Sequence, residues 1–353
     1  MDIYSSDEDI DFAIAARIRN QRKARQFQPR KFEEEIDDKT FRERYCVPRN
    51  VLDQLEEILT DKLKHNTHRN CSLQPRDQIK IFLHFIGTSA FYHILRDCHG
   101  VSTETVHRAV HSVCDALFDL RENYIHWPEN PQHLANKFYE VAGMPSVCGL
   151  IDGSHILITP PAADEDAFIN RHQDHSLNVL AVCGPDLKIY YANSRAPGRW
   201  HDSRVLRESA LWEEFEVRGQ RIFPGAVLLG DAGYPNNDWI ITPFIGQLDR
   251  TKEKFNTAHT KTRNGIERCF GVLKHRFYAL QNRIRFQSLD QASKLVHCAC
   301  ILHNMCIAEN DDGSDLPEVG AHNQDHNFQI VQDPPVNLGQ ADRRRQQILQ
   351  HFA

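Results

Sequence analysis

Between residues 39 and 140, apolar side chains recur at every third or fourth position, which is the spacing of one buried helix face. After Gly100, Ser102 can cap a further helix. The polar face of that helix would carry Thr103, Thr105, His107, Arg108 and His111. The order of helix, glycine turn and capped helix predicts a helix-turn-helix, which either reads DNA or serves only as packing.

From about residue 147 the pattern changes to short apolar runs separated by turn residues, which is typical of strands. We expect strands over 147–158, 177–183, 188–193 and 226–230. We expect helices over 259–280, 293–307 and 341–352. Four regions follow from these patterns: a flexible charged arm (1–38), a helical region (39–140), a mixed-sheet core (145–308) and a mostly disordered tail with a short C-terminal helix (309–353). The fold class is therefore α+β or α/β.

Carboxylates stand at notable points of this pattern. Asp152 and Asp231 each follow an apolar run, and Glu267 lies in the long predicted helix. One such aspartate alone is usually a turn residue or a helix cap. Three acids on a first strand, a later strand and a following helix would instead meet at one end of a mixed sheet. Oxygen ligands of this kind suit Mg²⁺, and paired divalent ions catalyse phosphodiester cleavage.

Composition narrows the class of protein. The chain has 353 residues, 41% of them apolar and 25% charged, as in ordinary globular proteins. No stretch is apolar enough to span a bilayer, and the acidic start is no secretory signal. The ten cysteines form no Cys-x-x-Cys pair, which favours a reducing compartment. The formal net charge of −6 fits DNA poorly, but the segments 17–31 and 252–285 are locally basic.

A second cluster of metal-type ligands lies in the helix predicted over 293–307. It consists of His297, Cys298, Cys300, His303 and Cys306. Ligands on one helix cannot complete the tetrahedral site that zinc requires. Buried packing is therefore the preferred interpretation of these side chains.

Several short motifs occur together and in order: 149–156 (GLIDGSHI), 197–203 (PGRWHDS), 229–235 (LGDAGYP), 255–259, 266–277 and 302–304. As a set they resemble the DDE superfamily transposases of the PIF/Harbinger type and the domesticated Harbinger transposase-derived nucleases. The resemblance covers about residues 40–307. It implies an RNase H-like catalytic core behind an N-terminal helix-turn-helix region.

The resemblance also implies roles for individual residues. Asp152 would bridge two metal ions, Asp231 and Glu267 would each hold one, and Asp202 falls at a further metal-binding position. The implied cofactor is Mg²⁺ or Mn²⁺. Candidate DNA contacts are Arg199, His201, Arg263, Arg268, Lys274, Thr103, Thr105 and Arg108.

The expected activity is metal-dependent hydrolysis of DNA, with strand transfer as a related reaction of the same site. Two alternatives stay open: a domesticated DNA-binding or scaffold protein with an unused nuclease site, and an RNase H-type enzyme acting on RNA or hybrids. The family implies a nuclear location, with the cytoplasm as a second one, and a Myb/SANT-like or MADF-type partner that brings the enzyme to DNA. A homodimer is a further expectation, and no membrane association is expected.

Overall fold

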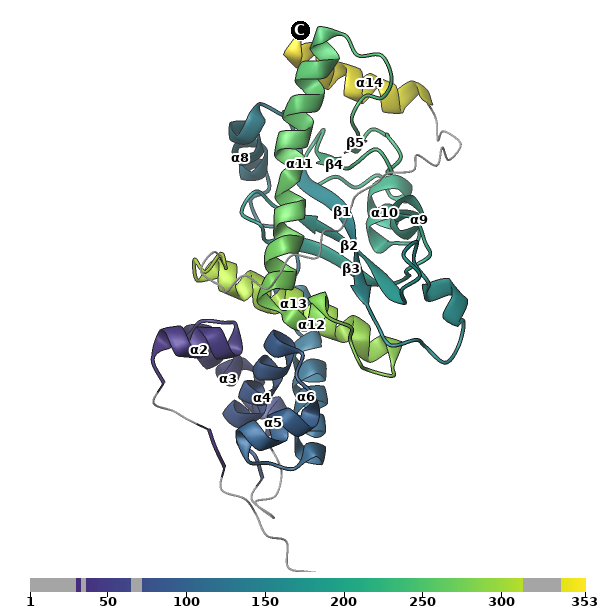
Figure 1. The fold of residues 1–353 in the computed structure, drawn as a ribbon. Helices are drawn as coiled ribbons and strands as arrows, with labels where there is room; N and C mark the ends of the chain where they lie inside the picture. The colour runs from purple at the N-terminus through teal and green to yellow at the C-terminus, as the bar shows by residue number, and fades with distance from the viewer. Residues whose placement is uncertain (1–29, 33–35, 65–71, 314–337) are drawn as a thin grey trace, which may run out of the picture.

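The computed structural model describes residues 30–32, 36–64, 72–313 and 338–353 (Figure 1). Most of the charged arm predicted over 1–38 lies outside these residues, as does the tail segment 314–337. No helix among the described residues is both long and apolar enough to cross a membrane.

A mixed five-stranded sheet forms the centre of the chain, in the order β3-β2-β1-β4-β5. Its strands are β1 (Val147–Leu157), β2 (Ser176–Cys183), β3 (Ile189–Pro197), β4 (Val227–Leu229) and β5 (Ile240–Ile241). Strands β1, β2 and β3 are antiparallel neighbours, whereas β4 runs parallel to both β1 and β5. This arrangement confirms the α+β core, and four of its strands were expected. The fifth strand, β5, was missed because two residues are too short to show any periodicity.

Apolar side chains cover both faces of this sheet. Val147 and Leu150 of β1 belong to a core shared with Ile266 of helix α11 (Arg250–Arg276). Ile151 points the other way, into a second core with Leu206. The second core is built from α9 (Asp202–Arg207), α10 (Ala210–Trp212) and the π-helical turn η2 (Glu213–Val217). Because both faces are covered, the middle of β1, which carries Asp152, lies between α11 and the segment of α9 and α10, and Figure 1 shows the arrangement of these elements.

Helix α11 differs from its prediction at both ends. It was expected to begin at residue 259, but it begins at Arg250, because the Asp249 carboxylate accepts a hydrogen bond from the Lys252 amide (2.9 Å) and caps it. It ends at Arg276, and the short helix α12 (Tyr278–Gln281) follows. Helix α13 (Leu289–Ala308) also starts earlier than expected, because Ser288 caps it. The C-terminal helix is present as α14 (Leu338–Leu349) with the turn η3 (Gln350–Phe352).

The N-terminal helices form a separate layer below the sheet in Figure 1. They are α2 (Asp38–Tyr45), α3 (Arg49–Leu63), α4 (Pro75–Thr88), α5 (Tyr92–His99) and α6 (Thr103–Phe118). Gly100 ends α5 at a φ of 65°, and Ser102 caps α6 by accepting from the Thr105 amide at 3.1 Å. The predicted helix, turn and capped helix are therefore present. The short α7 (Arg121–Tyr124) and α8 (Gln132–Ala142) lead from this layer to β1, and the 3₁₀ turn η1 (Glu165–Phe168) lies between β1 and β2.

A buried ion pair fastens the helical layer to the end of the core. The Arg276 guanidinium is fully buried and donates to Asp311 at 2.8 Å. Arg42 of α2 donates to the same carboxylate at 2.6 Å. Residues from α2, from the end of α11 and from the segment after α13 are thus held together by one aspartate.

Candidate metal centre

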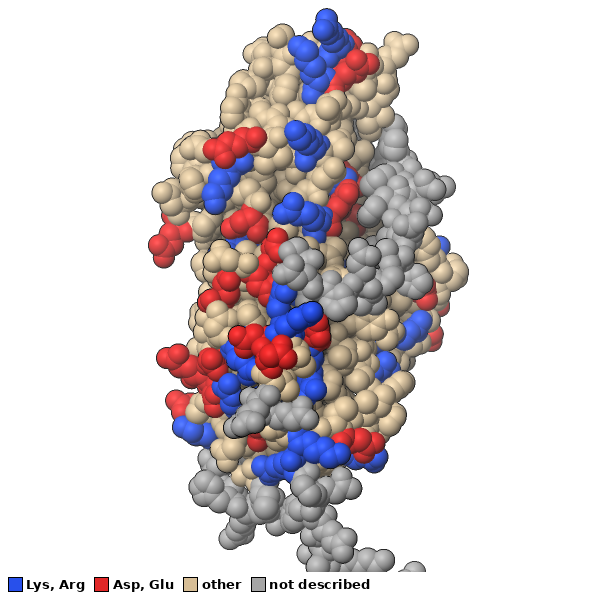
Figure 2. Space-filling model, turned by 60° about the vertical axis from the view of Figure 1, so that its left-hand side comes forward, with Lys and Arg blue, Asp and Glu red and all other residues tan. Residues whose placement is uncertain are grey.

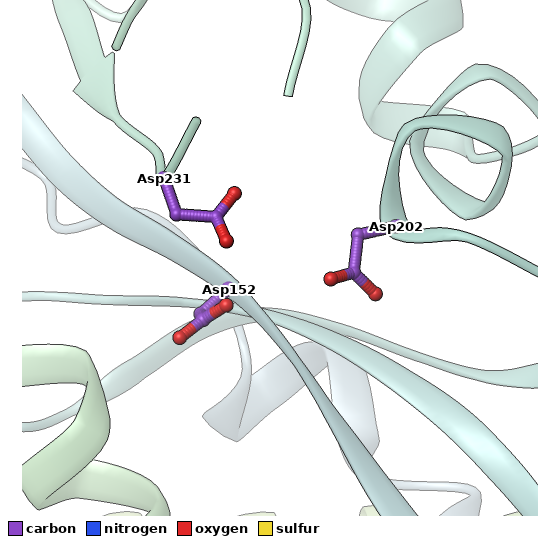
Figure 3. A group of neighbouring side chains, drawn as sticks. All are labelled: Asp152, Asp202 and Asp231. Atoms are coloured by element: carbon purple, nitrogen blue, oxygen red, sulfur yellow. The ribbon is translucent and has the colours of Figure 1, made fainter. Parts of the chain in front are cut away.

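Three aspartates from distant parts of the chain meet beside the middle of β1, where the shorter strand β4 has ended (Figure 3). Asp152 lies on β1, Asp202 is the first residue of α9, and Asp231 follows β4. Each offers a carboxylate oxygen, and these oxygens all lie within 4.8 Å of one another. Asp152 and Asp231 are buried, and Asp202 is half-buried. The three side chains turn toward a common point, which is the geometry of a shared cation site.

Strand register explains why two of these aspartates meet. In the parallel pairing of β1 with β4, Leu150 lies opposite Leu229. Asp152 and Asp231 each come two residues later, so their strands deliver them side by side. Asp231 thus lies at the carboxyl end of β4, a common place for ligand sites in sheets with parallel strands, whereas Asp152 lies within the longer β1.

Asp202 reaches the pair through a loop that is tied to β2. The Asn178 amide nitrogen donates to the Trp200 carbonyl at 2.9 Å and to Oδ1 of Asp202 at 2.8 Å. Gly153 of β1 lies directly beneath this carboxylate. A Cβ atom there would overlap Oδ1 of Asp202 and lie 3.0 Å from the Asn178 oxygen. The missing side chain of Gly153 thus lets Asp202 approach the strand.

Glu267 lies outside the group of three. It is one helical turn beyond Arg263 on α11, and Arg263 bridges it to the centre. One guanidinium nitrogen of Arg263 contacts Oδ2 of Asp152 at 3.2 Å, and the other contacts Glu267 at 2.5 Å. Gly265, between them, lets α11 approach β1, because a Cβ there would be 2.6 Å from Leu150. The structure therefore brings Asp152, Asp202 and Asp231 together directly, and Glu267 only through Arg263.

The electrostatics of the centre favour a bound cation. Burial raises the pKa of Asp152 to about 8; the charges of Asp231 and Asp202 also raise it, while Arg263 opposes the shift. Like charges at close range disfavour ionisation unless a cation offsets them. The carboxylate oxygens are the hard donors that Mg²⁺ and Mn²⁺ prefer. The donor set thus fits a divalent metal.

The remaining predicted contacts fall into three groups. Arg199, His201 and Arg268 are exposed. Lys274 turns inward, where its ammonium donates to the His155 carbonyl at 3.0 Å and burial lowers its pKa to about 8. This placement does not support the expected phosphate contact from Lys274, because its ammonium is enclosed by the core and directed at the His155 carbonyl. Thr103 and Arg108 are exposed on α6, and Thr105 is half-buried there, in the helical layer and away from the aspartates (Figure 1).

Sequence reasoning gave no role to three residues that shape the centre: Gly153, Asn178 and Tyr234. Asn178 carries the clearest signal, because it is a polar residue inside the apolar run of β2. Gly153 and Tyr234 stand in the motifs 149–156 and 229–235. Their neighbours in space come from other elements, so the sequence alone does not reveal what they contact.

The cysteines and histidines of α13 behave as packing residues. His303 is buried and contacts the Leu187 carbonyl at 2.9 Å through Nε2. His297 contacts the Ser194 hydroxyl at 3.0 Å. In the described part of the chain, only the three aspartates gather closely enough to hold a metal ion.

Comparison with known proteins supports the same interpretation. Residues 151–304 match the family described as DDE superfamily endonuclease. The rat protein named "Putative nuclease HARBI1" (Rattus norvegicus) is 30% identical over 327 residues, which is 91% of this chain and 92% of that protein. Its human counterpart is 29% identical over the same shares.

A more distant relative is "Protein ALP1-like" of Arabidopsis thaliana, 22% identical over 79% of this chain and 73% of that protein. No solved structure matches the chain. The family match includes all three converging aspartates and Glu267, and the animal relatives align over nearly the whole length. The chain therefore belongs to the Harbinger transposase-derived proteins of the DDE superfamily, the family of HARBI1.

Proposed function

We propose that this protein is a divalent-metal-dependent DNA endonuclease that hydrolyses phosphodiester bonds by a two-metal mechanism. The observation that carries the proposal is the convergence of Asp152, Asp202 and Asp231 from three separate elements. The family described as DDE superfamily endonuclease supports the reaction class. Attack by a DNA 3′ hydroxyl in place of water would make the same site a strand-transfer site.

The three aspartates would hold the metal, with Asp152 shared between the two ions and Glu267 as a further ligand. Bound divalent cations activate a water molecule and stabilise the charge that develops on the phosphodiester. Arg263 offsets part of the charge on Asp152 and Glu267. A cation at the centre competes with this guanidinium, which would then be free to turn toward a phosphate.

A nicking assay tests the proposal. Purified protein is incubated with supercoiled plasmid and with terminal-repeat DNA in Mg²⁺ or Mn²⁺. We expect cutting that disappears in Asp152→Ala and Glu267→Ala and in the presence of a chelator. Cutting by those variants at the wild-type rate would mean a contaminating nuclease and would remove the proposal.

The path of the DNA is a further proposal. Arg199 and His201 precede Asp202 closely in the chain, so their exposed side chains flank the centre. Arg268 is exposed on α11 next to Glu267. Charge reversal at Arg199 or Arg268 should weaken DNA binding. It should also make the slope of log binding constant against log salt concentration shallower by about one unit per lost phosphate contact. The same change at Arg108 tests the helix-turn-helix as a separate DNA surface.

One observation favours the second candidate, a DNA-binding or scaffold protein with an unused site. Arg263 already supplies a positive charge between Asp152 and Glu267. That candidate predicts DNA binding without cutting in any divalent metal. An RNase H-type activity would instead appear as preferential cleavage of RNA or hybrid competitors in the same assay.

We further propose a nuclear protein, also present in the cytoplasm, that works with a Myb/SANT-like or MADF-type DNA-binding partner. The net charge of −6 supports such a division of labour, because the chain itself attracts DNA weakly. On the described part of the face in Figure 2, basic and acidic side chains are interspersed. Cell fractionation and co-purification test the location and the partner, and light scattering tests the proposed homodimer.

A further inference from the structure

The hydroxyl of Tyr234 is buried beside the aspartates without a hydrogen-bond partner among the described residues. The residue is only 4% exposed, and its ring packs in the second core with Ile151 and Leu206. A buried hydroxyl without a partner costs about 1–3 kcal/mol, so its persistence calls for an explanation.

This hydroxyl lies within electrostatic range of the three aspartates of the metal centre. Burial raises the pKa of Tyr234 far above its usual value, and the charges of Asp202, Asp152 and Asp231 raise it further. A phenol hydroxyl can offer an anionic neighbour only its O–H donor. The hydroxyl nevertheless makes no hydrogen bond to any of the three carboxyl groups.

Local backbone geometry builds Asp231 and Tyr234 as one unit. The Gly233 amide donates to the Asp231 carboxylate at 2.9 Å, and the Tyr234 amide donates to the Asp231 carbonyl at 3.3 Å. This turn folds the tyrosine ring back under the strand end. Gly230 leaves room for the ring, because a Cβ there would be 3.0 Å from Cδ2 of Tyr234. The spacing of the motif 229–235 thus fixes where the hydroxyl lies.

A second buried atom at the same centre lacks a partner among the described residues. The Asn178 side chain donates to Asp202 through its nitrogen, but its Oδ1 atom has no hydrogen bond. Two polar atoms from different parts of the sheet, one a donor and one an acceptor, are thus left open around one carboxylate cluster. This pattern is expected where a polar ligand completes the bonding.

We propose that Tyr234 is a positioning residue whose hydroxyl donates a hydrogen bond to an oxygen atom of a ligand in the centre. That oxygen belongs either to a water molecule held with the cation or to a phosphate of the nucleic acid. The inference rests on the proposed function and adds to it a neutral donor from the second core.

The test uses Tyr234→Phe, which removes only the oxygen. Its control is Tyr190→Phe, because Tyr190 is also buried but donates to Asp186 at 3.3 Å, outside the centre. Melting temperature is measured with a chelator and over a Mn²⁺ titration. DNA affinity is measured by anisotropy of a labelled duplex, with Ca²⁺ as the cation.

Without metal, we expect Tyr234→Phe to melt at or above the wild-type temperature, because an unpaired buried hydroxyl is gone. If the oxygen belongs to water, the apparent Mn²⁺ affinity falls about tenfold. If it belongs to phosphate, Mn²⁺ affinity is kept and DNA affinity falls by about the same factor. Tyr190→Phe should melt below wild type without metal and keep both affinities.

Unchanged affinities for Mn²⁺ and DNA in Tyr234→Phe would overturn the inference. So would an equal loss of melting temperature with and without metal, because the hydroxyl would then be purely structural. The wild-type protein separates this failure from that of the proposed function. If Mn²⁺ raises the melting temperature of wild type but not of Asp152→Asn, the metal centre is supported whatever the result for Tyr234. If Mn²⁺ does not raise the melting temperature of wild type, both the proposed function and this inference are wrong.

Discussion

At the scale of single residues, the position of the Asp202 carboxylate depends on Gly153, whose side chain is a single hydrogen atom. Gly153 has no side chain where Asp202 crosses β1. Gly153→Ala should displace the Asp202 carboxylate and lower the affinity for Mn²⁺ about tenfold or more. Because the obstructed group is a side-chain end that can rotate, the melting temperature without metal should change little. A calorimetric Mn²⁺ titration beside thermal melting checks both, and a wild-type affinity would contradict this account of the centre.

The raised pKa of Asp152 predicts a pH dependence. The folded chain holds this proton up to about pH 8, whereas the ordinary carboxyl value is 3.8. The metal-free folded state is therefore stabilised at low pH and loses that contribution as the pH rises toward 8. In chelator, wild type should lose more free energy of unfolding between pH 5 and 8.5 than Asp152→Asn. Equal losses in urea denaturation would show that Asp152 ionises normally.

Metal binding should reverse this trend. A cation binds the ionised carboxylate, so it competes with the proton and its apparent affinity should rise as the pH approaches 8. The same urea series repeated in Mn²⁺ measures this effect, and Asp152→Asn is its control.

The sequence pattern singled out Asp152 and Asp231, because an acid that ends an apolar run is visible in it, and strand register brings the two together. Glu267 and Lys274 were harder to place. Arg263 links Glu267, on its own helix, to Asp152 of β1, and Lys274 donates to the His155 carbonyl of β1, so both placements depend on the interface between α11 and β1. Helical periodicity shows which face a residue occupies, but it does not show which partner that face meets.

At the scale of elements, helix α11 sets how closely Glu267 and Arg263 approach the sheet. Gly265 faces Leu150 at the contact with β1, whereas Gly271 on the same helix is exposed, and a Cβ there would meet no other atom within 4 Å. Gly265→Ala should overpack this contact and cost about 1–3 kcal/mol, less about 1 kcal/mol gained in helix propensity.

Gly271→Ala is the matched control, and it should raise the free energy of unfolding by about 1 kcal/mol. Urea denaturation of both variants measures the difference. If Gly265→Ala stabilises the protein, the Leu150 side chain can move aside at little cost. The contact between α11 and β1 then does not require a glycine.

Among elements, the sequence predicted those with long periodic runs, and it missed what depends on single caps or on very short pairing. The start of α11 is set by Asp249 and that of α13 by Ser288, each before any apolar residue repeats. Strand β5 exists only because Leu228 and Leu229 pair with Ile240 and Ile241. Such pairing depends on tertiary structure, so the local sequence pattern does not predict it.

At the scale of the whole molecule, the Asp311 carboxylate joins the helical layer to the core. Burial alone would raise its pKa, but hydrogen bonds from Arg276 and Arg42 hold the pKa well below the ordinary range. Its stabilising effect is therefore complete at neutral pH and is lost only in strong acid.

Asp311→Asn should cost about 3–5 kcal/mol at pH 7, because the Arg276 guanidinium is left buried without its counter-charge. The control is Asp119→Asn, which removes the partner of Lys62 from a solvent-exposed pair and should change little. Chemical denaturation measures the free energy of unfolding of both variants. Similar small losses in the two would mean that water reaches Arg276.

The contacts of the same carboxylate depend on the order in which the chain is synthesised. Arg42 and Asp311 are 269 positions apart, so this ion pair cannot form until the ribosome has added 269 residues after Arg42. At about 5–20 residues per second, the newborn N-terminal helices wait on the order of ten seconds to a minute for their last partner. During that interval the apolar side chains of α4 and α6 that later pack against α12 and α13 are uncovered, and chaperones bind exposed apolar surface of this kind.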